Sequence, residues 1–155
     1  MFAATQTGGS RRRFLLGLTA SLVLLASPLL HASELLTFDG LYKSNTVLGL
    51  KFADRTLALK GQTVRLRGYM APPLKPESKF FVLTREPVAI CPFCSSDAEW
   101  PVDIVVIYAS KTVLPTNFSE RIEVEGALEV GSFIDPATGF VSQLRIRDAV
   151  FHKIN

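Results

Sequence analysis

The chain has 155 residues, of which 48% are hydrophobic and 20% are charged, and its formal net charge is +3. All of the excess charge comes from Arg11, Arg12 and Arg13, because the remaining 14 Lys and Arg residues equal the 14 Asp and Glu residues. A chain that is neutral outside one short arginine run lacks the basic surface that nucleic-acid binding requires, so we expect no nucleic-acid partner.

Residues 1–33 have the pattern of a twin-arginine export signal. The motif residues are Arg11, Arg12, Phe14 and Leu15. An apolar segment follows them, and small residues at its end predict cleavage after Ala32 or Ser33. The signal predicts a bacterial periplasmic protein, the twin-arginine translocase as its partner during export, and no membrane anchor after cleavage.

Residues 34–61 form the least regular part of the remaining chain, and we expect them to be a lead-in with short helical turns at 38–42 and 53–59. Residues 62–155 are expected to form one domain, because a hydrophobic period of two dominates from Gln62 onward. The expected strands cover residues 63–69, 79–85, 102–109, 120–130 and 141–154. In the last strand Leu144, Ile146 and Val150 are expected to face inward. Gly68 and Gly126 interrupt good strand patterns, as the bends of a barrel require.

Five strands within about 90 residues predict a mainly β fold, a small five-stranded Greek-key barrel of the OB type with one or two short helices. In that topology the first and fourth strands are neighbours. Arg65 and Arg67 should then face Glu123 and Glu125 on the outer surface, where opposite charges stabilise the pairing. A generic antiparallel sandwich has the same hydrophobic pattern and remains an alternative.

The run Cys91-Pro92-Phe93-Cys94 is the one motif that suggests a specific chemistry. Outside the cytosol the two thiols can close a disulfide that shapes the loop. They can also exchange with other disulfides, although a strand follows too soon for a thioredoxin fold. In a third interpretation the two thiolates bind zinc, with Asp97 and His152 as candidates for the other ligands. The sequence contains no nucleophile elbow, phosphate loop or His-Glu-x-x-His motif, so an enzyme is not the expected class.

The run Leu-Lys-Gly-Gln-Thr-Val-Arg-Leu-Arg-Gly-Tyr-Met at 59–70, followed by Pro72 and Pro73, resembles an uncharacterised family of small exported bacterial proteins with a Gly-Tyr-Met-x-Pro opening. The strand 80–83 and the cysteine loop extend this resemblance. The loop is also similar to that of an exported OB-like module reading Cys-Cys-x-x-Asp-Ala, with one cysteine moved to position 91. The resemblance implies an OB-type fold over residues 59–149. Since members often lie near ABC-type exporters and zinc-responsive transport genes, it also implies an accessory or metal-handling role.

The sequence thus predicts a periplasmic binding or accessory protein that handles zinc, or supports an ABC-type transporter, through the Cys91–Cys94 loop. Two alternatives remain. One is a thiol-disulfide redox protein, and the other is a structural interaction module whose loop is held by a disulfide.

Overall fold

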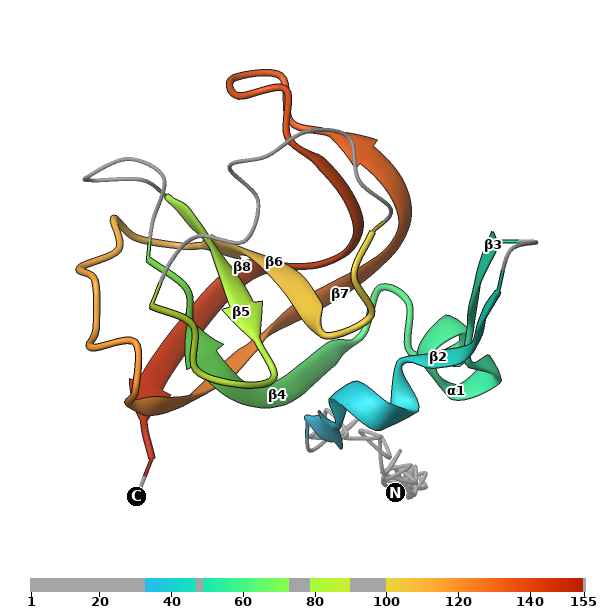
Figure 1. The fold of residues 1–155 in the computed structure, drawn as a ribbon, viewed down its shortest axis with the longest axis horizontal. Coiled ribbons are helices and arrows are strands. Elements are labelled where there is room, and N and C mark those ends of the chain that lie inside the picture. The colour runs from blue at the N-terminus through green and yellow to red at the C-terminus, as the bar shows by residue number, and fades with distance from the viewer. Residues whose placement is uncertain (1–32, 47–48, 73–78, 90–99, 155) are drawn as a thin grey trace, which may run out of the picture. The chain divides into compact units, whose positions relative to one another are not determined.

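The computed structural model describes residues 33–46, 49–72, 79–89 and 100–154, which are coloured in Figure 1. The predicted export signal, apart from Ser33, and three of the predicted site residues, Cys91, Cys94 and Asp97, lie outside the described residues. The described chain is mainly β. Its elements are β1 (Glu34–Leu36), the 3-10 helix η1 (Phe38–Gly40), β2 (Tyr42–Thr46), β3 (Gly49–Phe52), α1 (Asp54–Ala58), β4 (Thr63–Met70), β5 (Phe80–Thr84), β6 (Ile104–Ala109), β7 (Arg121–Ile134) and β8 (Val141–Lys153).

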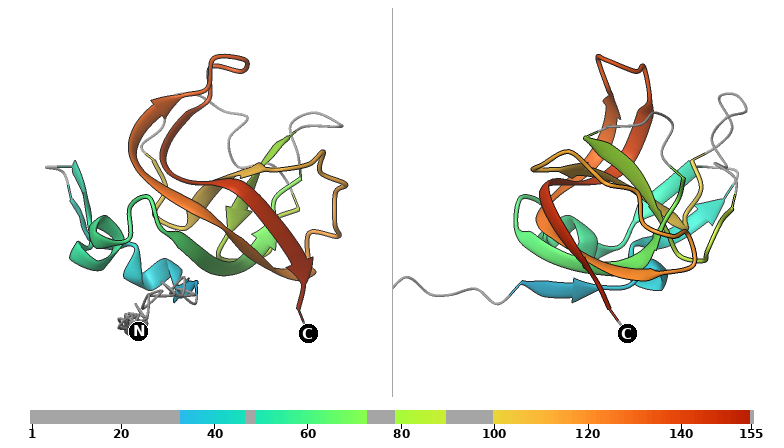
Figure 2. Two further views of the ribbon diagram at one scale, coloured as in Figure 1. Left: turned by 180° about the vertical axis from the view of Figure 1, so that it is seen from behind. Right: turned by 90° about the vertical axis from the view of Figure 1, so that its left-hand side faces the viewer.

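The main sheet has the strand order β1-β4-β5-β6-β8-β7, and β4 pairs with β7 as well (Figures 1 and 2). The pairs β4–β5, β5–β6, β7–β8 and β4–β7 are antiparallel, whereas β6 and β8 run parallel. β1 adds to β4 in parallel, and β2 and β3 form a separate two-stranded sheet. Each strand from β4 to β8 therefore pairs with two others of the same set.

The five strands expected from the period of two correspond to β4–β8, so this part of the prediction is confirmed. Their alternating apolar side chains build one core cluster, in which Val64, Leu66, Phe81, Val105 and Leu144 are almost fully buried. β6 is buried on both faces, as its unbroken apolar run predicts. A second, smaller cluster on its other face consists of Ala71, Val82 and Ile104.

The prediction for the end of β8 was wrong. Leu144 and Ile146 are fully buried as expected, but Val150 is 57% exposed and Ala149 is buried in its place. The cause is an irregularity around Asp148, which has a φ of +50° where the register against β6 and β7 shifts. A bulge of this kind exchanges the inward and outward positions of all the following residues.

The lead-in contains more strand than the sequence predicts. The two short helical segments are present as η1 and α1, but β1, β2 and β3 were missed. Leu36 of β1 joins the main core, and Tyr42 of β2 stacks on Phe52 of β3 with ring centroids 5.4 Å apart. The Tyr42–Phe52 stack lies within the lead-in, and Leu36, Tyr42 and Phe52 connect it to the core built by β4–β8.

Arg65 and Arg67 of β4 do face the glutamates of β7, and this prediction is confirmed. Both guanidinium groups bind Glu123: Nε of Arg67 donates to it over 2.6 Å, and Nη1 of Arg65 over 3.4 Å. The hydrogen bond from Arg67 is the main cause that lowers the pKa of Glu123. Glu123 is only 6% exposed, so this ion pair lies largely inside the strand surface.

Gly126 is required by a close backbone approach. A Cβ at this position would lie 2.5 Å from the carbonyl oxygen of Arg147 and 3.0 Å from the Cα of Ala149. A side chain therefore cannot fit here without moving the backbone of β8.

Candidate functional site

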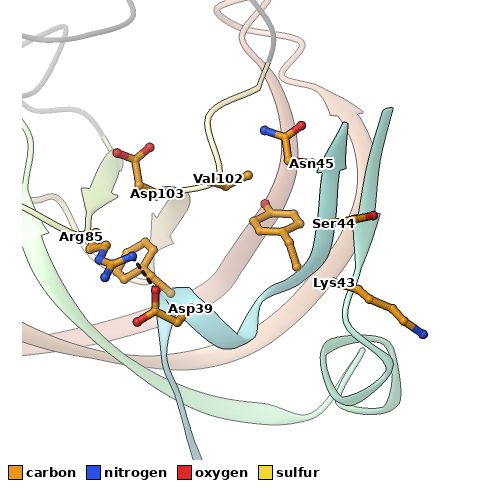
Figure 3. Close-up of a pocket in the computed structure, with 9 residues that line it drawn as sticks. Asp39, Lys43, Ser44, Asn45, Arg85, Val102 and Asp103 are labelled. Atoms are coloured by element: carbon orange, nitrogen blue, oxygen red, sulfur yellow. Dashed lines mark hydrogen bonds and ion pairs between the residues drawn. The ribbon is translucent and has the colours of Figure 1, made fainter. Parts of the chain in front are cut away.

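A pocket of about 220 Å³ opens beside η1, β2 and the segment that joins β5 to β6. Figure 3 shows Asp39, Arg85 and Asp103 on one side of it and Ser44 and Asn45 on the other. The ring of Tyr42 also lines the pocket. The lining is mixed: Phe38, Tyr42 and Val102 contribute apolar surface, and the side chains of Asp39, Arg85, Asp103 and Asn45 contribute polar groups.

Arg85 and Asp103 are the points where the segment 86–102 leaves β5 and enters β6. The backbone N–H of Arg85 donates to the carbonyl oxygen of Asp103 over 3.0 Å. Nη1 of Arg85 also donates to Oδ1 of Asp39 over 2.5 Å (Figure 3). Because segment 86–102 contains both cysteines, the two stems of the cysteine loop are joined to each other at the pocket and tied to η1.

Trp100 gives the returning stem a second attachment. Its indole Nε1–H donates to the hydroxyl oxygen of Tyr42 over 2.8 Å. Burial raises the pKa of Tyr42 to about 12, although the Trp100 hydrogen bond lowers it slightly. The Tyr42 phenol is therefore neutral under ordinary conditions and acts as a fixed acceptor that connects β2 to the loop.

The charged groups of the pocket are unevenly paired. The carboxylate of Asp39 is bound to Arg85, and Lys43 points away toward Asp54, with its Nζ 3.6 Å from that carboxylate (Figure 3). The Asp103 carboxylate forms no hydrogen bond or ion pair with any residue that the structure describes. A carboxylate in this state can accept a cation or a hydrogen-bond donor.

His152, the remaining predicted zinc ligand, lies on β8 opposite Glu123 and is exposed. Ala149 of β8 is level with Ala109, the last residue of β6, in the parallel β6–β8 pair. His152 thus lies beyond the C-terminal end of β6, whereas the cysteine loop enters β6 at its N-terminal end. Among the described residues no group of three or more His, Cys, Asp or Glu side chains is arranged to hold a metal ion.

The sequence did not indicate the pocket residues Asp39, Tyr42, Arg85 and Asp103. They come from three separate segments, and no local pattern connects them. One residue could have pointed to the pocket. Trp100 is the one tryptophan of the chain, and a tryptophan that is partly buried usually donates its N–H group to an acceptor.

No protein-family model matches the sequence, and no curated protein matches it. Among solved structures the chain is similar to a DUF3299-family protein from Pseudomonas aeruginosa PAO1, with 16% sequence identity and a TM-score of 0.53. The match covers 80% of this chain and 97% of that protein. At this identity the likeness concerns the fold, and it is consistent with an uncharacterised family. Within the described part of the chain, no helix has the length and apolar character needed to cross a membrane.

Proposed function

We propose that this chain is an exported accessory protein of the bacterial periplasm that handles zinc through the Cys91–Cys94 loop. One observation carries the proposal: the two stems of this loop are fixed at a pocket that also holds the unpaired Asp103 carboxylate. A thiolate pair supplies half of a zinc site, and carboxylates are accepted as further ligands. Fixed stems reduce the conformational entropy that the loop loses on metal binding.

The remaining ligands are proposed as Asp97 within the loop and Asp103 at the pocket. The register of β6 and β8 favours Asp103 over His152, because His152 lies beyond the other end of β6. Two thiolates and two carboxylates around a zinc ion would give the site a net charge of about −2. The cation Arg85 lies beside Asp103 and reduces this excess.

An OB-type barrel is proposed for β4–β8, which would follow the lead-in of residues 34–61. The pairing order β4-β5-β6-β8-β7, the return from β7 to β4 and the parallel β6–β8 pair all support it. The arginine motif supports removal of residues 1–33 after export by the twin-arginine translocase. A transporter of the ABC type is the proposed recipient of the metal, on the basis of the family resemblance alone.

The test is a measurement of bound zinc and free thiols on protein purified from the periplasm after native export. We expect one zinc per chain, with two thiols freed when a chelator removes the metal. Cys91→Ser should abolish the zinc, and Asp103→Asn should weaken its binding at least tenfold, as loss of a ligand does. Asp54→Asn is the matched control, because Asp54 is an exposed carboxylate that pairs with Lys43 outside the pocket.

A stable Cys91–Cys94 disulfide with no metal in any preparation would refute zinc handling. The reduction potential would then separate the two alternatives. A value below about −300 mV indicates a structural bond, and a higher value indicates thiol-disulfide exchange.

A further inference from the structure

Arg85 and Asp103 are neighbours across the β5–β6 ladder, yet their side chains do not pair. Thr84 is opposite Ile104 in that ladder, and the backbone N–H of Arg85 donates to the carbonyl oxygen of Asp103 over 3.0 Å, so these two residues form the next opposite pair. Side chains of opposite residues in an antiparallel pair lie on the same face, where opposite charges attract each other. The guanidinium of Arg85 is nevertheless directed to Asp39, and within the part of the chain that the structure describes no ion pair joins it to Asp103 (Figure 3).

Two other carboxylates lie near the Arg85 guanidinium. Asp39 of η1 binds it, with Oδ1 2.5 Å from Nη1, whereas Oε1 of Glu86 lies 4.0 Å from Nε. The side chain of Asp39 is 73% exposed and that of Glu86 is 77% exposed, so burial does not favour one carboxylate over the other. The short hydrogen bond makes Asp39 the residue that decides where the guanidinium lies.

The position of Asp39 is fixed by the buried residues on either side of it. Phe38 is 9% exposed and Leu41 is fully buried, and both belong to the main core cluster. The N–H of Leu41 donates to the carbonyl oxygen of Phe38 over 3.2 Å, which closes the turn that carries Asp39. The 3-10 helix therefore presents the Asp39 carboxylate to Arg85 from a support that is anchored in the core (Figure 3).

We propose that Asp39 is a positioning residue of the metal site: it holds the guanidinium of Arg85 away from Asp103 and so keeps the Asp103 carboxylate available to zinc. This role rests on the proposed function, because it concerns the same carboxylate. A guanidinium and a metal ion compete for the lone pairs of one carboxylate, and charge-assisted Arg–carboxylate hydrogen bonds are among the strong ones. Asp39 itself is not a ligand, because its carboxylate is bound to Arg85.

A simpler effect of Asp39 has to be separated from this one. Any carboxylate near the site attracts a cation through its charge alone, whether or not Arg85 is present. Positioning requires Arg85, because without the guanidinium no side chain is held away from Asp103. The effect of removing the Asp39 charge should therefore disappear when Arg85 is absent.

The experiment measures the zinc affinity of the exported protein by competition with a chromogenic chelator, for Asp39→Asn, Arg85→Gln and the double variant. Asp39→Asn should weaken zinc binding about fivefold, because the released guanidinium turns to Asp103. A fivefold change corresponds to about 1 kcal/mol, the upper end of what an exposed ion pair contributes. In the Arg85→Gln background the same substitution should change the zinc affinity by less than about twofold.

Glu86→Gln is the matched control. It removes one carboxylate charge beside the same arginine, from a residue whose oxygen lies 4.0 Å away and so beyond hydrogen-bond distance. Its zinc affinity should equal that of the unchanged protein within about twofold. Circular dichroism and thermal unfolding show whether each variant is folded.

A crystal structure of metal-free Asp39→Asn tests the position of Arg85 independently of zinc, and we expect the guanidinium to bind Asp103 there. Three results would overturn the inference: a guanidinium that stays away from Asp103 in that structure, an unchanged zinc affinity of Asp39→Asn, or an equal loss of affinity with and without Arg85. If the unchanged protein binds no zinc, or if Asp103→Asn binds it equally well, the proposed zinc site is wrong. The metal-free structure then still decides whether Asp39 holds Arg85 away from Asp103.

Discussion

The hydrogen bond between Trp100 and Tyr42 anchors one stem of the cysteine loop, and its contribution to the free energy of unfolding can be predicted. Tyr42→Phe removes the acceptor and leaves a partly buried indole N–H group without its partner. Since the Phe ring can keep the stack on Phe52, the loss should be that of one hydrogen bond. We expect a decrease of about 1–2 kcal/mol in the free energy of unfolding at pH 7.

The same residue should make this difference depend on pH. The pKa of Tyr42 rises from 10.0 in a model peptide to about 12 in the fold, mainly through burial. Above pH 10 the unfolded chain loses the phenol proton more readily than the folded chain, so stability falls as pH rises toward 12. At pH 11 the unchanged protein should have lost about 1.4 kcal/mol through Tyr42, since one pKa unit corresponds to about 1.36 kcal/mol. The Phe variant cannot lose this amount, so the two proteins should become nearly equal in stability.

The assay is urea unfolding followed by circular dichroism at pH 7 and pH 11. Both cysteines are replaced by serine in every protein, so that thiol chemistry at pH 11 does not contribute. Trp100→Phe is the control, because it removes the donor but keeps the buried phenol, and its stability should still fall between the two pH values. A stability difference between Tyr42→Phe and its parent that is the same at both pH values would refute the reasoning.

Three further predictions concern the strands around the site and the hairpin formed by the ends of β7 and β8. Gly126→Ala should lower the free energy of unfolding by about 3 kcal/mol, because the added Cβ meets backbone atoms of β8. Gly139→Ala should lower it by only about 1 kcal/mol, because the added Cβ meets no atom there and the cost comes from the φ of +71° alone. Urea unfolding measures both changes. Glu129→Gln should lower the free energy of unfolding by about 1–2 kcal/mol in the same assay, because Arg145, which is 7% exposed, loses its charged partner. The loss is no larger because Glu129 is partly exposed and solvent screens the ion pair. Burial opposes ionisation of Asp135, but hydrogen bonds from Thr138 and Tyr108 outweigh this effect and lower the pKa of its carboxyl group. The stability that Asp135 contributes is therefore present above about pH 4 and is lost as the pH falls further. Between pH 7 and pH 3 the melting temperature of Asp135→Asn should fall less steeply than that of the unchanged protein.

The sequence predicts the strands β4–β8 well because each buries one face, so its apolar residues recur with a period of two. β2 and β3 have no such pattern, since residues 42–46 read Tyr-Lys-Ser-Asn-Thr and are mostly exposed. β1 has three residues and forms only through a parallel pairing with β4, which is distant in the sequence. Elements defined by tertiary contact of this kind leave no periodic signal.

The error at Val150 has a related cause. Leu144, Ile146 and Val150 follow one alternation in the sequence, and nothing in that alternation reveals that Asp148 adopts a positive φ. Aspartate adopts a positive φ more often than most residues, but only a small fraction of all aspartates do so. The composition of a strand therefore predicts which residues can be buried, whereas a single bulge decides which of them are.

The pocket and the hairpin lie at opposite ends of one ladder. In the β5–β6 pair Thr84 is opposite Ile104, next to Arg85 and Asp103 of the pocket, while Phe80 is opposite Tyr108. Phe80 contacts Phe140 and Tyr108 contacts Phe133, which both belong to the hairpin. Four residues of strand separate the two ends, or about 13 Å at the usual rise per residue. Sites this far apart without shared partners normally act independently.

Independence of the two ends predicts that a change in the hairpin leaves the pocket unaffected. Glu129→Gln, which removes the carboxylate shared by Arg145 and Arg147, should leave the zinc affinity unchanged within about 0.5 kcal/mol, whereas Asp103→Asn should weaken it. A larger change in the zinc affinity of Glu129→Gln would mean that β5 and β6 transmit a change from one end of the ladder to the other.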